Sequence, residues 1–338
     1  MRTNTTIEDV ARQAGVSRAA VSKVIRNAYG VSDDMRRRVE TAIDILGYRP
    51  SVAARAMRGS SFTIGVEIPS LANNFFDSLL RGANATLDGT GYQIIIAPAG
   101  PDHDNGPKAI QALADRHVDG ILAVSPAVPP PWLEKLGARV PLVMIGRHDE
   151  SQHYDTVVDD DLLGIRLAVE HLLGLGHRRI AHVTITPEAE NQLPQAPHAL
   201  RTLGYLAAMA SAGLQELTQV VHVAPTEEAT YLATLALLDE PHPPTAIVAG
   251  HDELAMGALT AVAERGLKAA QCSVVGYDDT HIAAHPLVSL TSVNQCAPDM
   301  GSAAVKMLLE RIDGRTAPVH RIFTPSLVAR RSSAPIAG

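Results

Sequence analysis

The chain has 338 residues, of which 46% are hydrophobic and 19% are charged, and its formal net charge is -7. This length allows about two domains and a small extra module, and the composition excludes a disordered or collagen-like chain. No apolar run reaches the ~18 residues of a membrane span, and no apolar signal core follows Met1. The only cysteines, Cys272 and Cys296, lack CxxC spacing. We therefore expect a cytoplasmic protein without a metal site, a disulfide framework or a membrane partner.

The charge is distributed unevenly along the chain. Residues 1–60 carry eleven Lys and Arg against six Asp and Glu, a charge of +5, whereas the remaining residues carry 18 against 30, a charge of -12. Phosphate contacts need local positive charge, and an acidic body discourages non-specific binding elsewhere. The asymmetry therefore favours a basic head that binds a polyanion, although charge alone leaves open a merely solvated surface.

The first expected helix covers residues 7–14. Thr6 can cap it, and Asp9 stands three residues later, as in a capping box. Apolar residues recur along this segment at i, i+3, i+4 and i+7. Gly15 then supplies a residue that can adopt a positive φ after the last turn, so we expect the helix to end there.

A second helix is expected to follow a short turn. Ser17 can cap it, and Val21 and Val24 lie on its inward face, which leaves a short, polar and basic outward face. Two helices joined by a short turn containing glycine form a helix-turn-helix unit, whose second helix places its N-terminal residues along base edges in the major groove. Arg18 and Ala19 are therefore expected to face bases.

A third helix, from the Ser32 cap to Gly47, completes an all-α DNA-binding domain over residues 1–50. Residues 51–60 begin with a possible serine cap and contain good helix formers, but the segment is too short to be helical alone. We interpret it as a hinge helix that folds on binding. A flexible linker remains the alternative.

From residue 61 the pattern changes to short apolar runs that alternate with helical stretches such as 76–87 and 107–116. The expected strands cover residues 64–68, 93–96, 120–124 and 142–145 in a first set and 179–183, 220–223, 246–248 and 273–275 in a second. Such alternation predicts parallel sheets with helices on both faces. We expect two doubly wound α/β lobes, with a ligand cleft at their boundary.

Several stretches resemble the lactose/galactose repressor (LacI/GalR) family of transcriptional regulators. They are Thr6–Ser17, Val21–Val24, Gly47–Pro50 and Ala54–Arg58 in the head, and Ile68–Phe76, His171–Ala181 and Val275–Asp279 in the body. The resemblance implies a periplasmic-binding-protein-like core over residues 61–338. We place lobe 1 at about 61–160 and 291–322, and lobe 2 at about 161–290 and 323–338.

The resemblance also implies which residues contact DNA. The expected set is Thr6, Ser17, Arg18, Ala19, Ser22, Lys23, Arg26, Ser51, Ala54, Arg55 and Met57. In the family, two paired hinge helices wedge an apolar side chain, usually leucine, into the minor groove. Met57 stands at that position and can still act as an apolar wedge, whereas Arg26 replaces the usual Asn.

The effector-binding residues implied by the resemblance lie in the body. They are Asn74, Phe75, Phe76, Arg147, Arg201, His251, Asp252 and Asp278. A guanidinium and a carboxylate can each bracket vicinal hydroxyls, and an aromatic face can cover a sugar ring. Without the family, Arg201 would be interpreted as a surface residue and the two phenylalanines as core. His251, and Asp161 within Asp160–Asp161, depart from residues usual in the family.

These observations predict a DNA-binding transcriptional regulator, most simply a repressor. It would bind a near-palindromic double-stranded operator as a homodimer, use no cofactor and respond to a small effector, a sugar or sugar derivative. A sugar-binding receptor without a regulatory role is the alternative. An enzyme is not expected, because the sequence contains no G-x-S-x-G, H-E-x-x-H, Walker or G-x-G-x-x-G motif in a suitable context.

Overall fold

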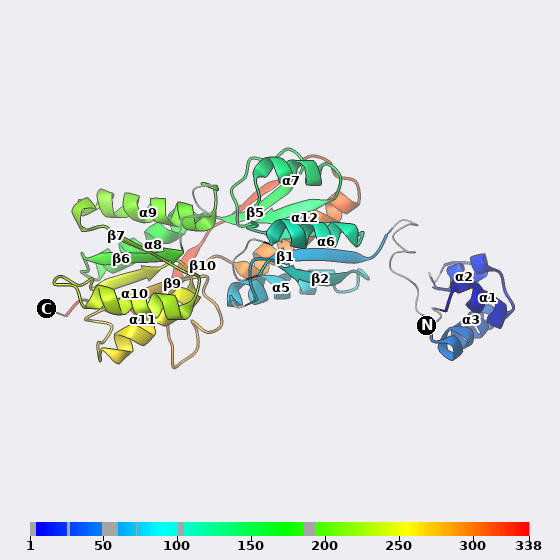
Figure 1. The fold of residues 1–338 in the computed structure, drawn as a ribbon, viewed down its shortest axis with the longest axis horizontal. Helices are drawn as coiled ribbons and strands as arrows, with labels where there is room; N and C mark the ends of the chain where they lie inside the picture. The colour runs from blue at the N-terminus through cyan, green and yellow to red at the C-terminus, as the bar shows by residue number, and fades with distance from the viewer. Residues whose placement is uncertain are drawn as a thin grey trace. The chain divides into compact units, whose positions relative to one another are not determined.

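The computed structural model describes residues 5–25, 28–48, 60–71, 73–100, 105–185 and 193–337. The chain divides into two compact units, Met1–Ser61 and Phe62–Gly338, which are described separately below (Figure 1). The first unit is the basic head, and the second is the acidic body.

The head contains three helices, α1 (Ile7–Ala14), α2 (Arg18–Ile25) and α3 (Asp33–Leu46). Its local structure follows the expected capping signals. Thr6 Oγ1 accepts a hydrogen bond from Asp9 N at 3.3 Å, and Thr6 N donates to the Asp9 carboxylate at 3.0 Å. Gly15 ends α1 with φ 64°, in the left-handed region that favours glycine. Apolar side chains from all three helices, including Val10, Val21 and Val39, form one small core.

Lobe 1 of the body contains a six-stranded sheet in the order β11-β5-β4-β3-β1-β2, and all its neighbouring strands are parallel. The strands are β1 (Thr63–Ile68), β2 (Gln93–Pro98), β3 (Gly120–Val124), β4 (Leu142–Ile145), β5 (Asp155–Asp159) and β11 (His320–Phe323). One face packs against α5 (Asn74–Leu87) and α12 (Ala297–Ile312), and the other against α6 (Gly106–Asp115) and α7 (Pro130–Gly137). The backbones of α5 and α12 approach closely, because a Cβ at Gly301 would lie only 2.0 Å from the carbonyl oxygen of Leu79.

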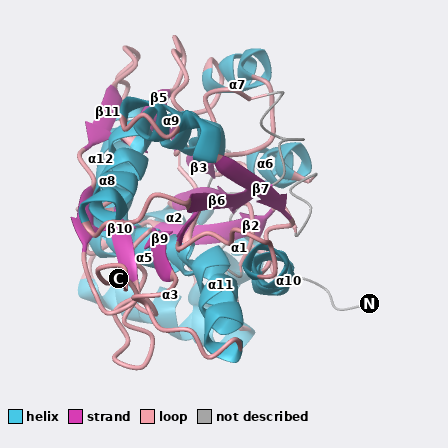
Figure 2. Cartoon of the chain, turned by 90° about the vertical axis from the view of Figure 1, so that its left-hand side faces the viewer, coloured by secondary structure: helices cyan, strands magenta, loops and turns pink. Residues whose placement is uncertain are grey.

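Lobe 2 contains a second six-stranded sheet, in the order β12-β10-β9-β8-β6-β7. The strands are β6 (Ile180–Ile185), β7 (Gln219–Val223), β8 (Ala246–Ala249), β9 (Ser273–Tyr277), β10 (Thr291–Asn294) and β12 (Ser326–Val328). Its pairings are parallel except for the antiparallel edge strand β12. The helices α8 (Asp161–Gly174) and α9 (Pro197–Ser211) cover one face, and α10 (Glu227–Leu238) and α11 (Asp252–Glu264) cover the other (Figure 2).

The chain passes between the lobes three times, after β5, after β10 and after β11. This corrects one expected boundary. Residues 291–294 do not open the last segment of lobe 1, because they form β10 and pair with β9 and β12 in lobe 2. Phe323 likewise belongs to lobe 1, where it pairs with Asp159. The second and third crossings therefore lie at residues 295–296 and 324–325.

Residues 332–337 are bonded into lobe 2. Ser332 Oγ donates to the carbonyl of Val274 at 2.6 Å, and the backbone N–H groups of Ile336 and Ala337 donate to carbonyls of residues 175 and 270. No helix in the described part of the chain is long and apolar enough to cross a membrane. No group of three or more His, Cys, Asp or Glu in that same part could hold a metal ion.

Candidate nucleic-acid interface and effector site

The outward face of α2 has the expected composition. Ser17, Arg18, Ala19 and Lys23 are exposed, and Ser22 is half-buried. Ser17 Oγ accepts a hydrogen bond from Ala20 N at 3.2 Å, so it caps the first turn of α2 and fixes the start of this face. The N-terminal end of the helix therefore presents the short polar side chains and the arginine that a major-groove contact requires.

Arg18 pairs with Glu8 of α1 at 2.9 Å, and both side chains are more than half exposed. An exposed ion pair of this kind contributes little to stability. Arg18 can therefore exchange Glu8 for a base edge at low cost.

Thr6 has a local structural role, because its hydroxyl donates to Asp9 at 2.7 Å as well as capping α1. The same hydrogen bonds from Thr6 lower the pKa of Asp9. The other expected DNA contacts lie outside the described residues. They are Arg26, Ser51, Ala54, Arg55 and Met57.

The second site lies at the junction of the two lobes and is centred on Arg201 of α9, which is only 4% exposed. Its Nε donates to Asp161 at 2.7 Å, and its Nη1 donates to the carbonyl of Gly250 at 2.7 Å. The guanidinium carbon lies 3.6 Å from the centre of the Tyr277 ring, a cation–π contact. Arg201 is therefore a buried junction residue and not the surface residue suggested by its helix alone.

Two contacts join the lobes at this point. The Tyr277 hydroxyl of β9 donates to Asp159 at the end of β5, at 2.6 Å. His148, in the loop after β4, lies with its Nε2 3.0 Å from the carboxylate of Asp161, the first residue of α8. Gly164 of α8 makes room for this arrangement, since a Cβ there would lie 2.1 Å from the Tyr277 hydroxyl oxygen.

The electrostatics of the junction reflect burial and crowded carboxyl groups. Burial and the neighbouring Asp161 raise the pKa of Asp159 to about 7. Burial lowers the pKa of His148, but the hydrogen bond to Asp161 and the nearby aspartates outweigh it, so the net shift is upward. Together with Arg201 and Tyr277, these groups form the polar bridge between the lobes.

Asp278 belongs to the same cluster. It follows β9 with φ 109°, an unfavourable backbone conformation for a residue with a side chain. Its Oδ1 accepts a hydrogen bond from Gln295 Nε2, a residue of the second crossing, at 2.5 Å. Burial raises the pKa of Asp278, against the lowering effect of Arg201. The conformation of Asp278 is thus held by the segment that connects the lobes.

His251 and Asp252 stand at the start of α11. Asp252 accepts hydrogen bonds from Thr280 N at 2.7 Å and from Ser292 Oγ at 2.6 Å, so it ties α11 to the loop after β9 and to β10. Burial raises its pKa to about 6. The ring of His251 meets that of His198 edge to face, with centroids 5.7 Å apart. We therefore interpret Asp252 as a positioning residue for the junction.

Four residues expected to contact the effector lie in lobe 1, and their role stays a prediction. Arg147 is wholly buried in lobe 1, where it forms a bidentate pair with Asp149 and donates to two backbone carbonyls. Phe75 and Phe76 pack in and against the core of lobe 1. Asn74 is the first residue of α5, after the Asn73 cap.

Sequence reasoning missed three members of the junction, Asp159, His148 and Gln295. The run Asp159–Asp161 at the end of an apolar segment was the available signal, because buried carboxyl groups need partners. Their partners lie far along the chain, so no local pattern could identify them.

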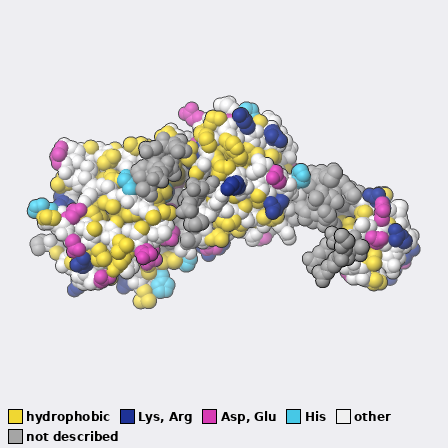
Figure 3. All heavy atoms as spheres, viewed as in Figure 1, with side chains coloured by type: hydrophobic (Ala, Val, Ile, Leu, Met, Phe, Trp, Pro, Cys, Tyr) yellow, Lys and Arg dark blue, Asp and Glu magenta, His cyan; other side chains and the backbone are white. Residues whose placement is uncertain are grey.

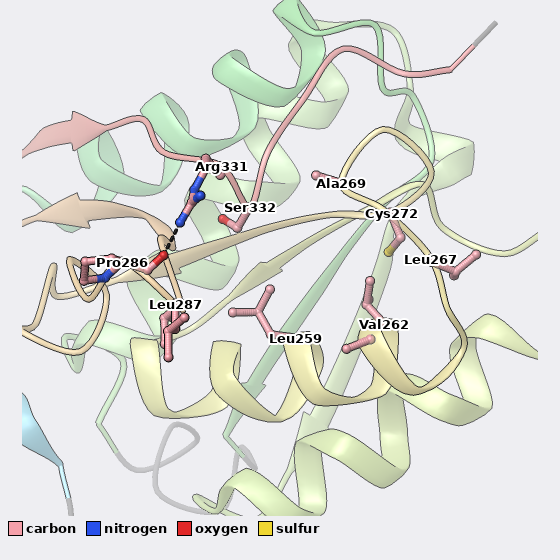
Figure 4. Close-up of a pocket in the computed structure, with 11 residues that line it drawn as sticks. Leu259, Val262, Leu267, Ala269, Cys272, Pro286, Leu287, Arg331 and Ser332 are labelled. Atoms are coloured by element: carbon pink, nitrogen blue, oxygen red, sulfur yellow. Dashed lines mark hydrogen bonds between the residues drawn. The ribbon is translucent and has the colours of Figure 1, made fainter.

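The part of the chain that the structure describes also contains a pocket of about 410 Å³, on lobe 2 (Figure 4). Apolar side chains of α11, including Leu259 and Val262, line it, together with Leu287, Cys272 and Arg331. Arg331 donates to the carbonyl of Pro286 across one side. None of the residues expected to bind the effector lines this pocket. It is therefore separate from the junction.

Comparison with known proteins gives matches over both units. Residues 6–51 match the model of the lacI family of bacterial regulatory proteins, and residues 169–333 match a periplasmic binding protein-like domain. The ribose operon repressor of Escherichia coli (strain K12) is 33% identical over 335 residues, covering 97% of this chain and 99% of that protein.

Two solved structures are also similar. A lac repressor dimer bound to operator and the anti-inducer ONPF has a TM-score of 0.81 and 27% identity, covering 98% of this chain and all of that one. A LacI family transcriptional regulator from Enterococcus faecium with bound ribose has a TM-score of 0.70 and 27% identity, covering 81% and 100%.

Proposed function

Because the chain belongs to the lacI family of bacterial regulatory proteins and is a DNA-binding transcriptional repressor rather than an enzyme, we propose that it binds a near-palindromic operator as a homodimer. A sugar or sugar derivative that binds at the interlobe junction changes its affinity for DNA. No cofactor takes part. Since its target is DNA, it works in the bacterial cytoplasm.

The observation that carries the DNA-binding part is the α2 face. A capped helix presents Arg18 and Ala19 at its exposed N-terminal end, on a head with a charge of +5. Bidentate contact of an arginine with guanine is a common form of base recognition, and the surrounding positive charge supplies sequence-independent affinity.

The effector part rests on the junction. Arg201 and Asp278 combine a charged donor and a carboxyl group in a buried place, as recognition of hydroxyl groups requires. One similar structure has bound ribose, and one similar protein is a ribose operon repressor. These names support a sugar as the effector class.

The homodimer is supported by exposed apolar side chains on the body. Ile95 and Ile96 of edge strand β2 are each 42% exposed, and Leu287 of lobe 2 is 90% exposed. Hydrophobic side chains also gather over the body on the face shown in Figure 3. Large exposed apolar patches mark association sites, and a two-fold dimer would match a near-palindromic operator.

The regulatory step is a shift between conformations. An effector changes DNA affinity only if it binds the two conformations of the body with different affinity. Residues 295–296 and 324–325 connect the lobes, and Gln295 also holds Asp278. A ligand that contacts Asp278 thus acts directly on a connecting segment.

Selection of bound sequences from random double-stranded DNA with the full-length protein tests the proposal. We expect a near-palindromic sequence to be enriched, and D-ribose or a related sugar to change the affinity for it. Residues 61–338 alone should not shift that DNA. Sugar binding without any enriched sequence would instead support a sugar receptor.

A further inference from the structure

The head carries an acidic side chain beside Arg18 that the cap of α1 does not use. Two acids, Glu8 and Asp9, stand in the first turn of α1. Asp9 accepts hydrogen bonds from the backbone N–H and the hydroxyl of Thr6, and it also pairs with Arg12. Glu8 instead reaches Arg18, the first residue of α2. The capping of α1 therefore does not explain Glu8.

A carboxylate at this place is unusual in a protein that binds a polyanion. In helix-turn-helix proteins the first helix crosses the DNA backbone, and the second helix reads the bases. An acidic side chain close to DNA repels the phosphate groups and lowers the affinity for every sequence. The side chain of Glu8 is 59% exposed, so the protein does not shield this charge. The repulsion is offset only where the DNA supplies a hydrogen-bond donor to the carboxylate.

The donors and acceptors of Arg18 and Glu8 match those of one base pair. Glu8 Oε1 lies 2.9 Å from Arg18 Nη1, so both charged groups address the same place. In the major groove a G·C pair presents two neighbouring acceptors on guanine, N7 and O6, followed by one donor on cytosine, N4. An arginine donates to both guanine acceptors, and a glutamate accepts from the cytosine amine. An A·T pair presents its donor between two acceptors and does not match this order.

The release of Arg18 from Glu8 leads to the same contact. When Arg18 moves to a guanine, the Glu8 carboxylate loses its cation beside the same base edge. Losing the exposed pair costs little, but a carboxylate without a donor at a DNA surface is disfavoured. Cytosine N4 supplies this donor, whereas thymine offers a further acceptor, O4, and a methyl group. Glu8 therefore favours cytosine and disfavours thymine at this position.

We infer that Glu8 is a specificity-determining residue that reads one G·C base pair together with Arg18, which contacts the guanine while Glu8 contacts the cytosine. This inference rests on the proposed operator binding and adds a residue of α1 to the recognition face of α2. It also gives Glu8 a second effect, which is a lower affinity for DNA that lacks this base pair.

The test uses the full-length protein and the operator that selection from random double-stranded DNA enriches. Anisotropy titrations measure the dissociation constant for that operator and for versions in which each base pair in turn is replaced. We expect Arg18→Ala and Glu8→Ala to lose discrimination at the same G·C pair, Glu8→Ala by about tenfold. Glu8→Gln keeps an acceptor oxygen without the charge, so it should lose less discrimination than Glu8→Ala.

Glu40→Ala is the matched control, because Glu40 is an exposed acid of α3 and its removal changes the charge of the head by the same one unit. Both substitutions should strengthen binding to DNA of unrelated sequence. Only Glu8→Ala should also change the base preference. If Glu8→Ala, like Glu40→Ala, strengthened binding to all sequences alike, Glu8 would act only through its charge and the inference would be wrong.

A modified base tests the contact at a single atom. Cytosine methylated at N4 still pairs with guanine, but the methyl group replaces the hydrogen that faces the major groove. The wild type should bind an operator with this base at the assigned pair about tenfold more weakly. Glu8→Ala should be almost indifferent to the methyl group. Equal losses of affinity for the two proteins would contradict a contact between Glu8 and cytosine.

The inference and the proposed function can fail separately. If Glu8→Ala kept the base preference of the wild type at every position, the inference would fail and the proposed function would stand. A loss at a base pair other than the one that Arg18→Ala affects would also contradict joint reading. Enrichment of no sequence by the wild type would overturn both. If Glu8→Ala does not fold, Glu8→Gln and the wild type still decide with the methylated cytosine.

Discussion

The head and the interlobe junction each place an arginine beside a carboxylate, but in opposite surroundings. Arg18 of the head pairs with Glu8 where both side chains are more than half exposed. Arg201 of the junction pairs with Asp161, and both side chains are buried. An exposed pair costs little to break, whereas breaking a buried pair leaves an uncompensated charge. Arg18 of the head can therefore exchange Glu8 for DNA, whereas the body needs the Arg201–Asp161 pair in order to stay folded.

The largest effect is expected from Arg201→Met. The substitution leaves Asp161 and Asp159 buried without their cation, so the free energy of unfolding of the body should fall by about 3–5 kcal/mol. Urea denaturation of the full-length protein measures this loss. Arg166→Met, which removes an exposed arginine from α8, should cost less than about 1 kcal/mol. If Arg201→Met lowered the free energy of unfolding by less than about 1 kcal/mol, the contrast between the two regions would be contradicted.

A second prediction concerns pH and Glu67, a buried residue of β1 with one carboxylate oxygen lacking a hydrogen-bond partner among the described residues. Burial raises its pKa from 4.5 to about 8. Between pH 4.5 and about 8 the folded protein keeps the proton on Glu67, whereas the unfolded chain has lost it. The free energy of unfolding therefore falls as the pH rises through this range, by about 1.4 kcal/mol for each pH unit.

Glu67→Gln should flatten the decline in unfolding free energy measured between pH 5 and pH 8. Glu170→Gln should leave the profile unchanged. Parallel profiles for wild type and Glu67→Gln would show that Glu67 is not the responsible group. Asp9 of the head has the opposite sign, because its pKa is lowered and its contribution is lost as pH falls.

A third prediction separates recognition from stability in the head. Arg18→Ala should reduce discrimination at one operator position by about 1–3 kcal/mol. It should barely change unfolding, because the lost pair with Glu8 is exposed. Anisotropy titrations with the selected operator and its single-base variants measure both sequence preference and affinity. Arg12→Ala, an exposed arginine of α1, is the control. Equal losses on every sequence for Arg18→Ala would count against base contact.

The smallest effect is expected at Thr6. Thr6→Ala removes the cap of α1 and should destabilise the head by about 1 kcal/mol. Thr6→Ser keeps the capping oxygen and should remain close to wild type in the thermal midpoint of the head. A different result would show that Thr6 acts mainly through a methyl contact with DNA and not through capping. In that case Thr6→Ser would bind DNA as poorly as Thr6→Ala, although its head would be as stable as that of the wild type.

The accuracy of the sequence predictions follows the distance over which each feature forms. Caps such as Thr6 and Ser32 bond to residues three positions away, so the helices of the head were predicted closely. Apolar runs such as β1 and β3 were also clear, because they are buried on both faces. These features depend on neighbours in the sequence.

The remaining features depend on distant partners. β5 was missed because it begins and ends with an aspartate, and the partners of its buried Asp155, which include Arg311 and Arg315, lie far along the chain. The bidentate pair of Arg147 with Asp149 was likewise not visible in the sequence pattern. The short strands β10 and β12 carry too few residues to show which sheet they join. Contacts between residues that are distant in the sequence, and not local composition, determine these strands and ion pairs.

The late position of β11, β12 and residues 332–337 has a consequence for synthesis on the ribosome. Lobe 1 receives an edge strand at residues 320–323, and lobe 2 receives strand β12 and the bonded segment after it. The helices of the head are complete once Leu46 has been synthesised, and the Leu46 carbonyl then accepts a hydrogen bond from the Thr5 hydroxyl. At 5–20 residues per second, the head emerges about 15 to 60 s before either lobe can close. During that interval a folded DNA-binding domain is tethered to an unfinished body, so chaperone protection matters most for the lobes.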